Sequence, residues 1–549
     1  MDSRVKEWSA TVAPEPWPIL GAWRSGRTPV AFAPSDIAYV LRDFRRPLHI
    51  VRSAIDGAMG VGTDGELMAS SSSDMFLLAT LPPLYPEWLG DRSFHENHNV
   101  RFAYISGSMA NGISTPTLVV AMAKAQMLGF FGAAGLSYQG VERGLAEIVR
   151  GLGEGKDSTW GANLIHSPGD PALEMSLAEL YISHGVRKVE ASAFMRLTPA
   201  VVHYALSGLT TDPAGQIVRN HSVFAKVSRP EVARQFMMPA PSAVVAELVA
   251  MGKLTTREAE LGQHVAVAED ITVEADSGGH TDNRPLGVLF PEVAGLRDQV
   301  AAECELARPV RVGAAGGLGT PRSVAAAFAM GADYVLTGSI NQTCAESGLS
   351  RSGRRLLADA KMSDVAMAPA ADMFELGVNL QVLQRGTMFA QRARKLYQMY
   401  RANPGLNAIV GEAERELEKI FGMEIGRVWD ETQDFWRQRD ASVLDRAARD
   451  PKFEMALVFR WYLGRSSRWA INGDSDRTID YQIWCGPALG GFNSWVADTY
   501  LADWEHRRVV DVALNLLEGA AQVTRAQQAR SHGVPVPSAA FQYLPRRLC

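Results

Sequence analysis

One pattern recurs through the middle of the chain and restricts what the chain can fold into. A short apolar or β-branched run is followed by a small or polar loop and then by an alanine-rich helical segment. Nearly unbroken apolar runs are typical of parallel strands that are covered on both faces. Eight runs of this kind are present, at residues 100–106, 129–133, 160–165, 188–192, 222–227, 271–275, 310–314 and 334–337.

Several of the intervening helices are expected to begin in the same way, with a hydroxyl residue before the helix and proline in its first turn. Proline is tolerated there because its missing N–H would have no partner within the helix. The pairs are Thr115 with Pro116, Thr198 with Pro199, Ser228 with Pro230, and Thr320 with Pro321.

The number of units predicts the fold class. Eight strand–helix units over about 250 residues match the size of a (β/α)8 TIM barrel. An open doubly wound sheet would favour a G-x-G-x-x-G turn after its first strand, and none follows here. We therefore expect an α/β chain with a small N-terminal α+β domain at 1–95, a TIM barrel at 96–345 and a C-terminal helical domain at 346–549. Seven of the twelve tryptophans lie in that last part, which indicates that it is packed.

Composition excludes several classes of protein. Apolar residues make up 47% and charged residues 21%, and the net charge is −5. This balance provides neither the basic surface of a nucleic-acid-binding protein nor a polybasic run for an anionic membrane. The four cysteines form no CxxC pair, so we expect reduced thiols in a cytosolic protein rather than a zinc site or disulfides.

Two segments bear on targeting and membrane insertion. Residues 1–18 are polar and rich in proline and lack the apolar core of a signal peptide. Residues 118–136 are the most apolar run, but Lys124 and three glycines interrupt it. We expect a helix, a turn and a buried strand there rather than a membrane span.

Glycine-rich loops follow three of the predicted strands. Barrel chemistry lies at the C-terminal ends of the strands, and the loops after strands seven and eight are the usual phosphate site. Glycines and small hydroxyl residues let backbone N–H groups converge on an anion. We therefore expect a bound phosphate group here. The candidates are Ser277, Gly278 and Gly279 after strand six, Gly316 and Gly317 after strand seven, and Gly338 and Ser339 after strand eight.

Other polar residues at the strand ends allow more than one interpretation. His280 is either an acid or polar group beside the reacting atoms, or a structural or phosphate-contacting histidine. Asn163 could bond a heterocyclic ring edge or cap a loop, and the loop Met109–Ala110–Asn111 could lie against a flat ring. Lys226 and Glu190 point into the barrel or reach its surface. The motifs of hydrolases, kinases and metal sites are missing from these loops.

Longer strings resemble known families. SMANGISTPTLVVAMAKAQMLGFFGAAG resembles the opening of flavin-dependent barrels such as nitronate monooxygenases and FMN-type enoyl-[acyl-carrier-protein] reductases, and DSGGH and GAAGGLGTP resemble their later flavin-phosphate loops. VEADSGGHTDNRP, MAPAADMFELGVNLQVLQRGTMFAQRARKLY and DYQIWCGPALGGFNSWV are similar to the PfaD family, the stand-alone enoyl reductases of polyunsaturated fatty acid synthases and trans-acyltransferase polyketide synthases. The resemblance covers nearly the whole chain.

The resemblance implies FMN reduced by NADPH, and hydride transfer to the β-carbon of an enoyl thioester on an acyl carrier protein. It implies that His280 is the catalytic candidate and that the C-terminal domain docks the carrier protein and synthase modules. Glu190, Asp276 and Asn341, at the strand ends, are substrate-pocket candidates. The implied FMN residues are Met109, Ala110, Asn111, Asn163, Lys226, Ser277, Gly278, Gly279, Gly316, Gly317, Gly338 and Ser339.

Other functions stay open at this point. A nitronate monooxygenase-like FMN oxidase would use the same flavin site with oxygen, and a non-catalytic assembly module would use only the helical part. The intact strand-end loops argue against a pure scaffold. The sequence leaves open NADPH against NADH, the number of subunits, a homodimer included, and whether His280 donates a proton or orients substrate.

Overall fold

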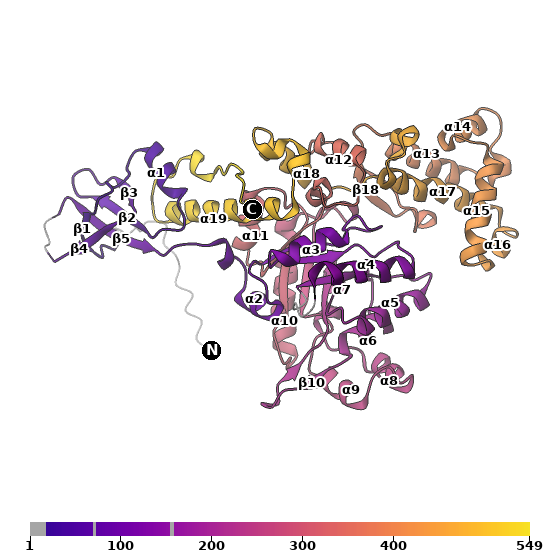
Figure 1. Ribbon diagram of the computed structural model, residues 1–549, viewed down its shortest axis with the longest axis horizontal. Coiled ribbons are helices and arrows are strands. Elements are labelled where there is room, and N and C mark those ends of the chain that lie inside the picture. The colour runs from indigo at the N-terminus through magenta and orange to yellow at the C-terminus, as the bar shows by residue number, and fades with distance from the viewer. Residues whose placement is uncertain (1–17, 70–72, 154–158, 549) are drawn as a thin grey trace, which may run out of the picture. The chain divides into compact units, whose positions relative to one another are not determined.

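The repeated unit of the sequence builds a closed barrel of eight parallel strands (Figure 1). All eight predicted strands are present, and three of them have the predicted bounds, so the TIM barrel is confirmed. In hydrogen-bonded order the strands are β12 (Ser222–Val227), β13 (Asp270–Glu274), β15 (Arg311–Ala315), β16 (Val335–Thr337), β6 (Tyr104–Ser106), β7 (Leu128–Phe131), β8 (Trp160–Ile165) and β9 (Lys188–Ser192).

The computed structural model describes residues 18–69, 73–153 and 159–548. Backbone contacts divide the chain into two units. The sheet unit comprises the described residues up to Pro86 together with Glu518–Tyr543, and the barrel unit comprises Glu87–Leu517 and the described residues from Leu544. The expected domain boundaries after residues 95 and 345 stay predictions.

Helices connect the barrel strands, and they begin largely as the sequence predicts. The side chains of Thr115, Thr198 and Thr320 cap their helices, and proline follows each. Ser228 is not a cap: the N-cap residue is Arg229, and the Ser228 hydroxyl donates instead to Asp282 at 3.0 Å. The helices are α2 (Arg92–His98), α3 (Pro116–Lys124), α4 (Tyr138–Leu152), α5 (Pro171–Ser183), α6 (Pro199–Leu206), α7 (Pro230–Met237), α8 (Ser242–Ala250), α9 (Thr256–Gly262), α10 (Leu286–Glu303) and α11 (Pro321–Ala329).

The apolar run at 118–136 forms most of helix α3, a turn and strand β7, as predicted. Among the helices that the structure describes, none combines the length and the apolar character that a bilayer crossing requires. A small hairpin of β10 (Thr210–Thr211) and β11 (Ile217–Val218) precedes β12.

The sheet unit is an antiparallel sheet packed against helices, which confirms the small α+β part. Ile37, Leu41 and Ile50 form an apolar cluster with Ala526 and Ala529 of α19 (Val509–Ser531). The second half of α19 therefore packs with the N-terminal sheet. Besides α1 (Pro34–Leu41), the unit contains strands in the order β3 (Met59–Gly62), β2 (Leu48–Ser53), β5 (Met75–Leu81), β1 (Gly21–Ser25) and β4 (Gly65–Met68).

The part after the barrel is mainly helical, as predicted, but the expectation of a helical domain at 346–549 is wrong for Asn379–Leu383. Asn379–Leu383 is strand β18, followed by a turn at Gly386 and by α13 (Phe389–Ala402). Strand β18 pairs on one side with β17 (Val365–Pro369) and on the other with β14 (Gly279–His280). Pairing with two strands overrides the helical preference of the local sequence.

Several of the remaining helices of this part pack around buried aromatic rings. Phe374, Phe389, Phe421, Phe459 and Tyr462 belong to one apolar cluster, against which four tryptophans pack. This confirms the packed region that the tryptophan density predicts. The helices are α12 (Arg351–Ala358), α14 (Glu412–Phe421), α15 (Ile425–Arg439), α16 (Ser442–Ala447), α17 (Pro451–Asn472) and α18 (Ala488–Val496).

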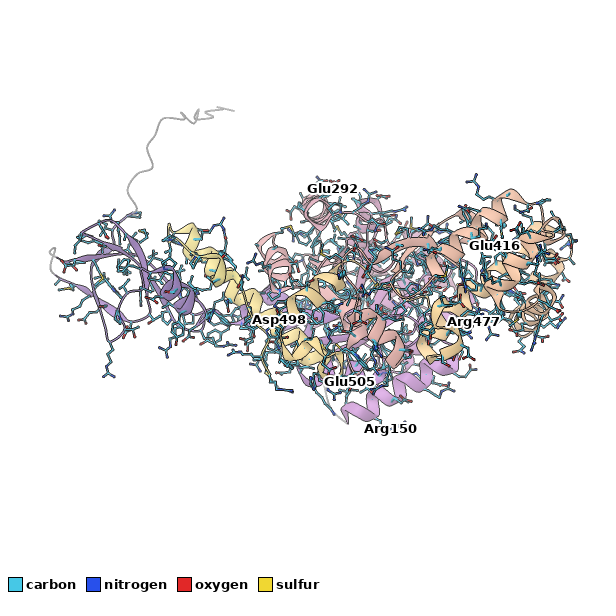
Figure 2. The ribbon with its side chains drawn as sticks, turned by 90° about the horizontal axis from the view of Figure 1, so that it is seen from above. Arg150, Glu292, Glu416, Arg477, Asp498 and Glu505 are labelled. Atoms are coloured by element: carbon cyan, nitrogen blue, oxygen red, sulfur yellow. The ribbon has the colours of Figure 1, made fainter. Side chains whose placement is uncertain are left out.

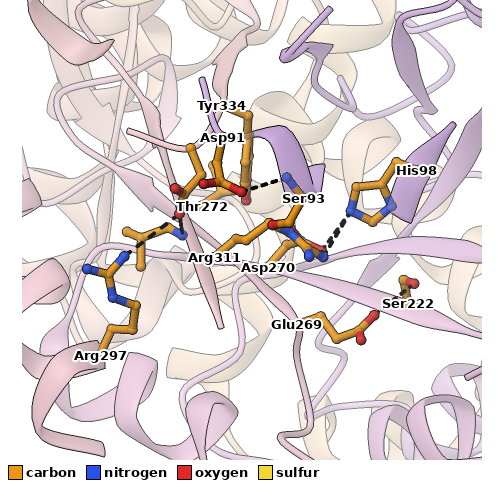
Figure 3. A network of polar contacts seen from close by, with 12 residues as sticks. Asp91, Ser93, His98, Ser222, Glu269, Asp270, Thr272, Arg297, Arg311 and Tyr334 are labelled. Carbon is orange, nitrogen blue, oxygen red and sulfur yellow. Dashed lines mark hydrogen bonds and ion pairs between the residues drawn. The ribbon is translucent and has the colours of Figure 1, made fainter. Parts of the chain in front are cut away.

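A buried ionic network crosses the N-terminal ends of β13 and β15 (Figure 3). The Asp270 carboxylate accepts hydrogen bonds from Arg311 Nε at 2.6 Å and a second Arg311 nitrogen at 2.9 Å, and it lies 3.0 Å from His98 Nε2. Burial alone would raise the pKa of Asp270, but Arg311 and His98 outweigh it and hold this pKa below its ordinary value. The network therefore keeps the buried carboxylate charged and paired, and removing either partner would leave an uncompensated buried charge.

We predict that Asp270→Asn lowers the free energy of unfolding by about 3–5 kcal/mol, because it leaves the Arg311 guanidinium buried without its counter-charge. Urea unfolding followed by circular dichroism measures the loss. Since the pKa of Asp270 is depressed, its contribution is present above the unfolded pKa of about 4 and is lost as the pH falls. The matched control is Glu96→Gln in the exposed Arg92–Glu96 pair, expected within about 0.5 kcal/mol. Equal effects of the two variants would contradict this.

Candidate active site

The three glycine-rich loops follow β13, β15 and β16 at the C-terminal ends of neighbouring barrel strands. Gly316 and Gly317 have φ of +82° and +71°, and Gly279 has +81°. A Cβ atom added at Gly279, Gly317 or Gly338 would meet no atom within 4 Å. The backbone at these three positions therefore faces open space that a ligand could approach closely.

Other glycines of these loops are required by close packing. A Cβ at Gly278 would lie 2.6 Å from the Cys485 backbone, and one at Gly319 would overlap the carbonyl of Ala488. The Gly486 amide donates to Ser339 Oγ at 3.0 Å. A segment from the C-terminal part thus lies against all three loops and fixes their backbones.

One amide of the predicted phosphate loops is already used by the protein. The Gly317 N–H donates to the Asp276 carbonyl at 3.1 Å, which joins the loop after β15 to the loop after β13. An anion here would have to be bound by the other amides and side chains of these loops.

A lysine lies between two carboxylates in the barrel. Lys226 Nζ on β12 is 3.5 Å from Glu190 on β9 and 3.4 Å from Glu274 on β13. Burial opposes the charged amine, but the two carboxylates outweigh it and raise the pKa of Lys226. Glu190 is fully buried, and its other oxygen accepts the Ser108 N–H at 2.6 Å. Both side chains point into the barrel, which settles the alternative that the sequence left open.

Asp276 and Asn341 hold loops together. The Asp276 carboxylate accepts from Gln381 Nε2 at 2.8 Å and from Asn283 Nδ2 at 2.9 Å. Asn341 is fully buried and donates to Ser106 at 2.9 Å, while its amide oxygen has no hydrogen-bond partner among the described residues. Their role as substrate-pocket residues stays a prediction.

The early loops are also held by hydrogen bonds. Asn163 is buried, and its Nδ2 donates to the Glu190 carbonyl at 3.0 Å and to Ser192 Oγ at 2.9 Å. Asn111 is left-handed at φ +57° and donates its N–H to the Ala134 carbonyl at 2.7 Å. Met109 is buried, whereas Ala110 and Asn111 are partly exposed. Contact of this loop with a flat ring stays a prediction.

His280 lies on β14, where it pairs with Leu380 of β18. Its Nε2 is 3.2 Å from Asp372 Oδ1, and the ring is 40% exposed. Burial opposes the charged ring, but the Asp372 hydrogen bond and charge, helped by Glu274, raise the pKa of His280. A raised histidine pKa means that the ring carries its second proton to a higher pH than usual.

The sequence reasoning missed Asp372 and Gln381, and it gave Glu274 no role. Asp372 and Gln381 follow the barrel in the chain, in a stretch expected to be helical, so nothing in the barrel periodicity indicated them. The string MAPAADMFELGVNLQVL, which contains both, carried part of the family resemblance and was the one available signal.

Two other kinds of site would be a metal centre and a cavity away from the barrel mouth. Within the described residues, no group of three or more His, Cys, Asp or Glu side chains could hold a metal ion. A cavity of about 330 Å³ lies in the helical part, lined by residues that include Trp461, Trp469, Glu431 and Arg477, the last labelled in Figure 2. None of the predicted site residues lines it.

Comparisons with known proteins agree with this architecture. Residues 94–395 match the family model of nitronate monooxygenase, and residues 403–481 match the inserted helical domain of [acyl-carrier-protein] S-malonyltransferase. The enoyl reductase domain of MlnA, from the macrolactin biosynthesis cluster of Bacillus amyloliquefaciens, is a similar solved structure. It is 35% identical with a TM-score of 0.76, over 81% of this chain and 99% of that one.

Curated relatives are longer proteins. The chain is 42% identical to one of the polyunsaturated fatty acid synthase subunits of Thraustochytrium sp., over 92% of this chain and 34% of that protein. It is 40% identical to the polyketide biosynthesis protein PksE of Bacillus subtilis, over 78% of this chain and 56% of that protein. The chain thus spans about a third to just over half the length of these two relatives.

We predict that Lys226→Met lowers the free energy of unfolding by about 3–5 kcal/mol, because the fully buried Glu190 loses its counter-charge. The matched variant Glu274→Gln keeps the Lys226–Glu190 pair and should cost clearly less. Urea unfolding of the two proteins at neutral pH measures the difference. A Lys226→Met effect below about 1 kcal/mol would show that the pair is not required by the fold.

Proposed function

The chain belongs to the nitronate monooxygenase family and, within it, to the PfaD type, and from this we propose that it is an FMN-dependent enoyl reductase acting in trans in polyketide or polyunsaturated fatty acid biosynthesis. The observation that carries the proposal is the likeness to a solved enoyl reductase domain, which this chain covers almost completely. The family and fold support an oxidoreductase. The substrate, cofactors and partners are part of the proposal.

The strand-end residues fit a flavin mononucleotide. Three glycines leave open space at the barrel mouth, two consecutive glycines are left-handed, and Lys226 stays charged in the barrel between Glu190 and Glu274. When bound, FMN would supply hydride transfer from NADPH to the β-carbon of the enoyl thioester. The residues proposed to hold it are Met109, Ala110, Asn111, Asn163, Lys226, Ser277, Gly278, Gly279, Gly316, Gly317, Gly338 and Ser339.

Lys226 and His280 have different proposed roles at the barrel mouth. Lys226, with its raised pKa, stays protonated at neutral pH and so orients groups by donating hydrogen bonds rather than by giving up a proton. His280 carries a proton that can be transferred to the α-carbon of the substrate. Its Nε2 faces Asp372, so Nδ1 is the ring nitrogen left for this transfer.

We propose that the substrate arrives on an acyl carrier protein of a synthase. The match of residues 403–481 to a helical domain of an acyl-carrier-protein transferase supports carrier docking by the C-terminal helical part. The alternative is a nitronate monooxygenase-like FMN oxidase, favoured only by the name of the family model that covers residues 94–395.

We expect the purified protein to be yellow and to bind FMN, and to consume NADPH when a crotonyl thioester is added under anaerobic conditions. An absorbance spectrum and the loss of NADPH absorbance measure the two properties. Oxygen consumption with an alkyl nitronate, without turnover of the thioester, would favour the alternative. A protein that takes up no flavin on reconstitution would contradict both functions.

We predict that His280→Ala keeps FMN and its reduction by NADPH but slows reoxidation by the enoyl thioester by about 10²-fold or more. The reason is that the α-carbon loses its positioned proton donor. Rapid mixing of each half-reaction, normalised to flavin content, measures the effect. Loss of flavin with normal turnover per bound flavin would instead assign His280 to the phosphate loop.

A further inference from the structure

Asp372 approaches His280 from outside the barrel. It lies in the 370–378 connection between β17 and β18, and His280 belongs to the loop after barrel strand β13. The two side chains meet because β14 and β18 are paired, with Gly279 opposite Gln381 and His280 opposite Leu380. The part after the barrel therefore contributes a charged group to the candidate site.

The backbone that carries Asp372 is fixed on both sides. The Ala370 N–H donates to the Val378 carbonyl at 2.9 Å and closes the connection at its base. Phe374 is fully buried against Tyr397 and Tyr400, with ring centroids 5.4 and 5.2 Å apart. The Asp372 carboxylate itself is 61% exposed, so the fold does not need it for packing.

The loop after β13, which leads into His280, is also fixed by hydrogen bonds from β18. Gln381 Nε2 donates to the Asp276 carboxylate at 2.8 Å and to the Ser277 carbonyl at 2.7 Å. These bonds fix the turn that leads into His280 without touching its ring. The backbone turn before the histidine and the orientation and charge of its ring are thus set by different residues, which allows them to be tested separately.

We propose that Asp372 is the positioning residue of His280, whose carboxylate accepts the Nε2–H bond, orients the ring and leaves Nδ1–H directed to the substrate. This inference rests on the proposed function. When bound, the flavin would supply the hydride for the β-carbon. At His280 the Nδ1–H bond breaks as a C–H bond forms at the α-carbon. The neutral ring keeps Nε2–H on Asp372 and regains its proton from water.

Charged groups on β12, β13 and α17 act on this pair. Glu274 on β13 favours the charged ring, Lys226 on β12 opposes it, and Asp372 exerts the largest favourable effect. Arg460 on α17 favours the ionised form of Asp372 and also lies 3.3 Å from Glu375. Removing the Asp372 charge leaves Glu274 and Lys226 with opposite effects on the ring.

The test is a pH titration of the full chain labelled with 13C at histidine Cε1, with the His280 signal assigned from His280→Gln. Asp372→Asn should move the titration midpoint of His280 to lower pH. Asp372→Glu keeps a carboxylate and should show a smaller shift. The matched control is Asp282→Asn, two residues after His280, whose carboxylate pairs with Arg229 and Ser228. In this control variant the titration midpoint of His280 should stay at the wild-type value.

The kinetic arm follows reoxidation of the NADPH-reduced protein by crotonyl thioester at pH 6 and pH 8. Asp372→Asn should lose at least about 5-fold more rate at pH 8 than at pH 6, because less of the ring is protonated there. An unchanged midpoint and an unchanged pH profile in Asp372→Asn would overturn the inference. Failure of the wild type to reduce the thioester would overturn the proposed function instead, and the titration would still decide the pairing.

Discussion

The pairing of β16 with β6 closes the barrel, and every residue of the candidate site depends on that closure. Val335, Leu336 and Thr337 lie opposite Tyr104, Ile105 and Ser106, so the last barrel strand meets the first. Parallel closure brings all the C-terminal strand ends to one mouth. Lys226 can then lie between carboxylates from the strands on either side of its own, and three glycine loops can follow one another around the rim.

The mouth is completed by residues that come much later in the chain. Gly278 has no side chain because the Cys485 backbone occupies the place where one would be, and β14 adds to the edge of β18. These contacts bring Asp372 to His280 and Gln381 to the turn before it. A barrel without this part would keep the glycine loops but would lose the carboxylate that favours a protonated histidine.

Features that depend on neighbouring residues in the chain could be predicted from the sequence, and features that depend on distant residues could not. The barrel strands and the threonine caps depend on local patterns: all eight predicted strands are present, three with the predicted bounds, and the three threonines cap their helices. Strand β18 could not be predicted, because its strand form depends on β14 and β17, and β14 is distant in sequence. The contact of Asp372 with His280 could not be predicted for the same reason. Nor could the packing of the second half of α19 with residues near the N-terminus. Ser228, unlike the three threonines, does not cap its helix, and its hydroxyl donates a hydrogen bond to Asp282.

The central claim is that FMN binds at the barrel mouth formed by these loops. Hydrogen–deuterium exchange of the full chain, with and without added FMN, tests it most directly by mass spectrometry of the peptides. We expect FMN to slow exchange in residues 276–281, 316–319 and 338–342, where glycine backbones face open space. Binding of FMN with unchanged exchange in all three loops, or with protection confined to residues 403–481, would contradict it.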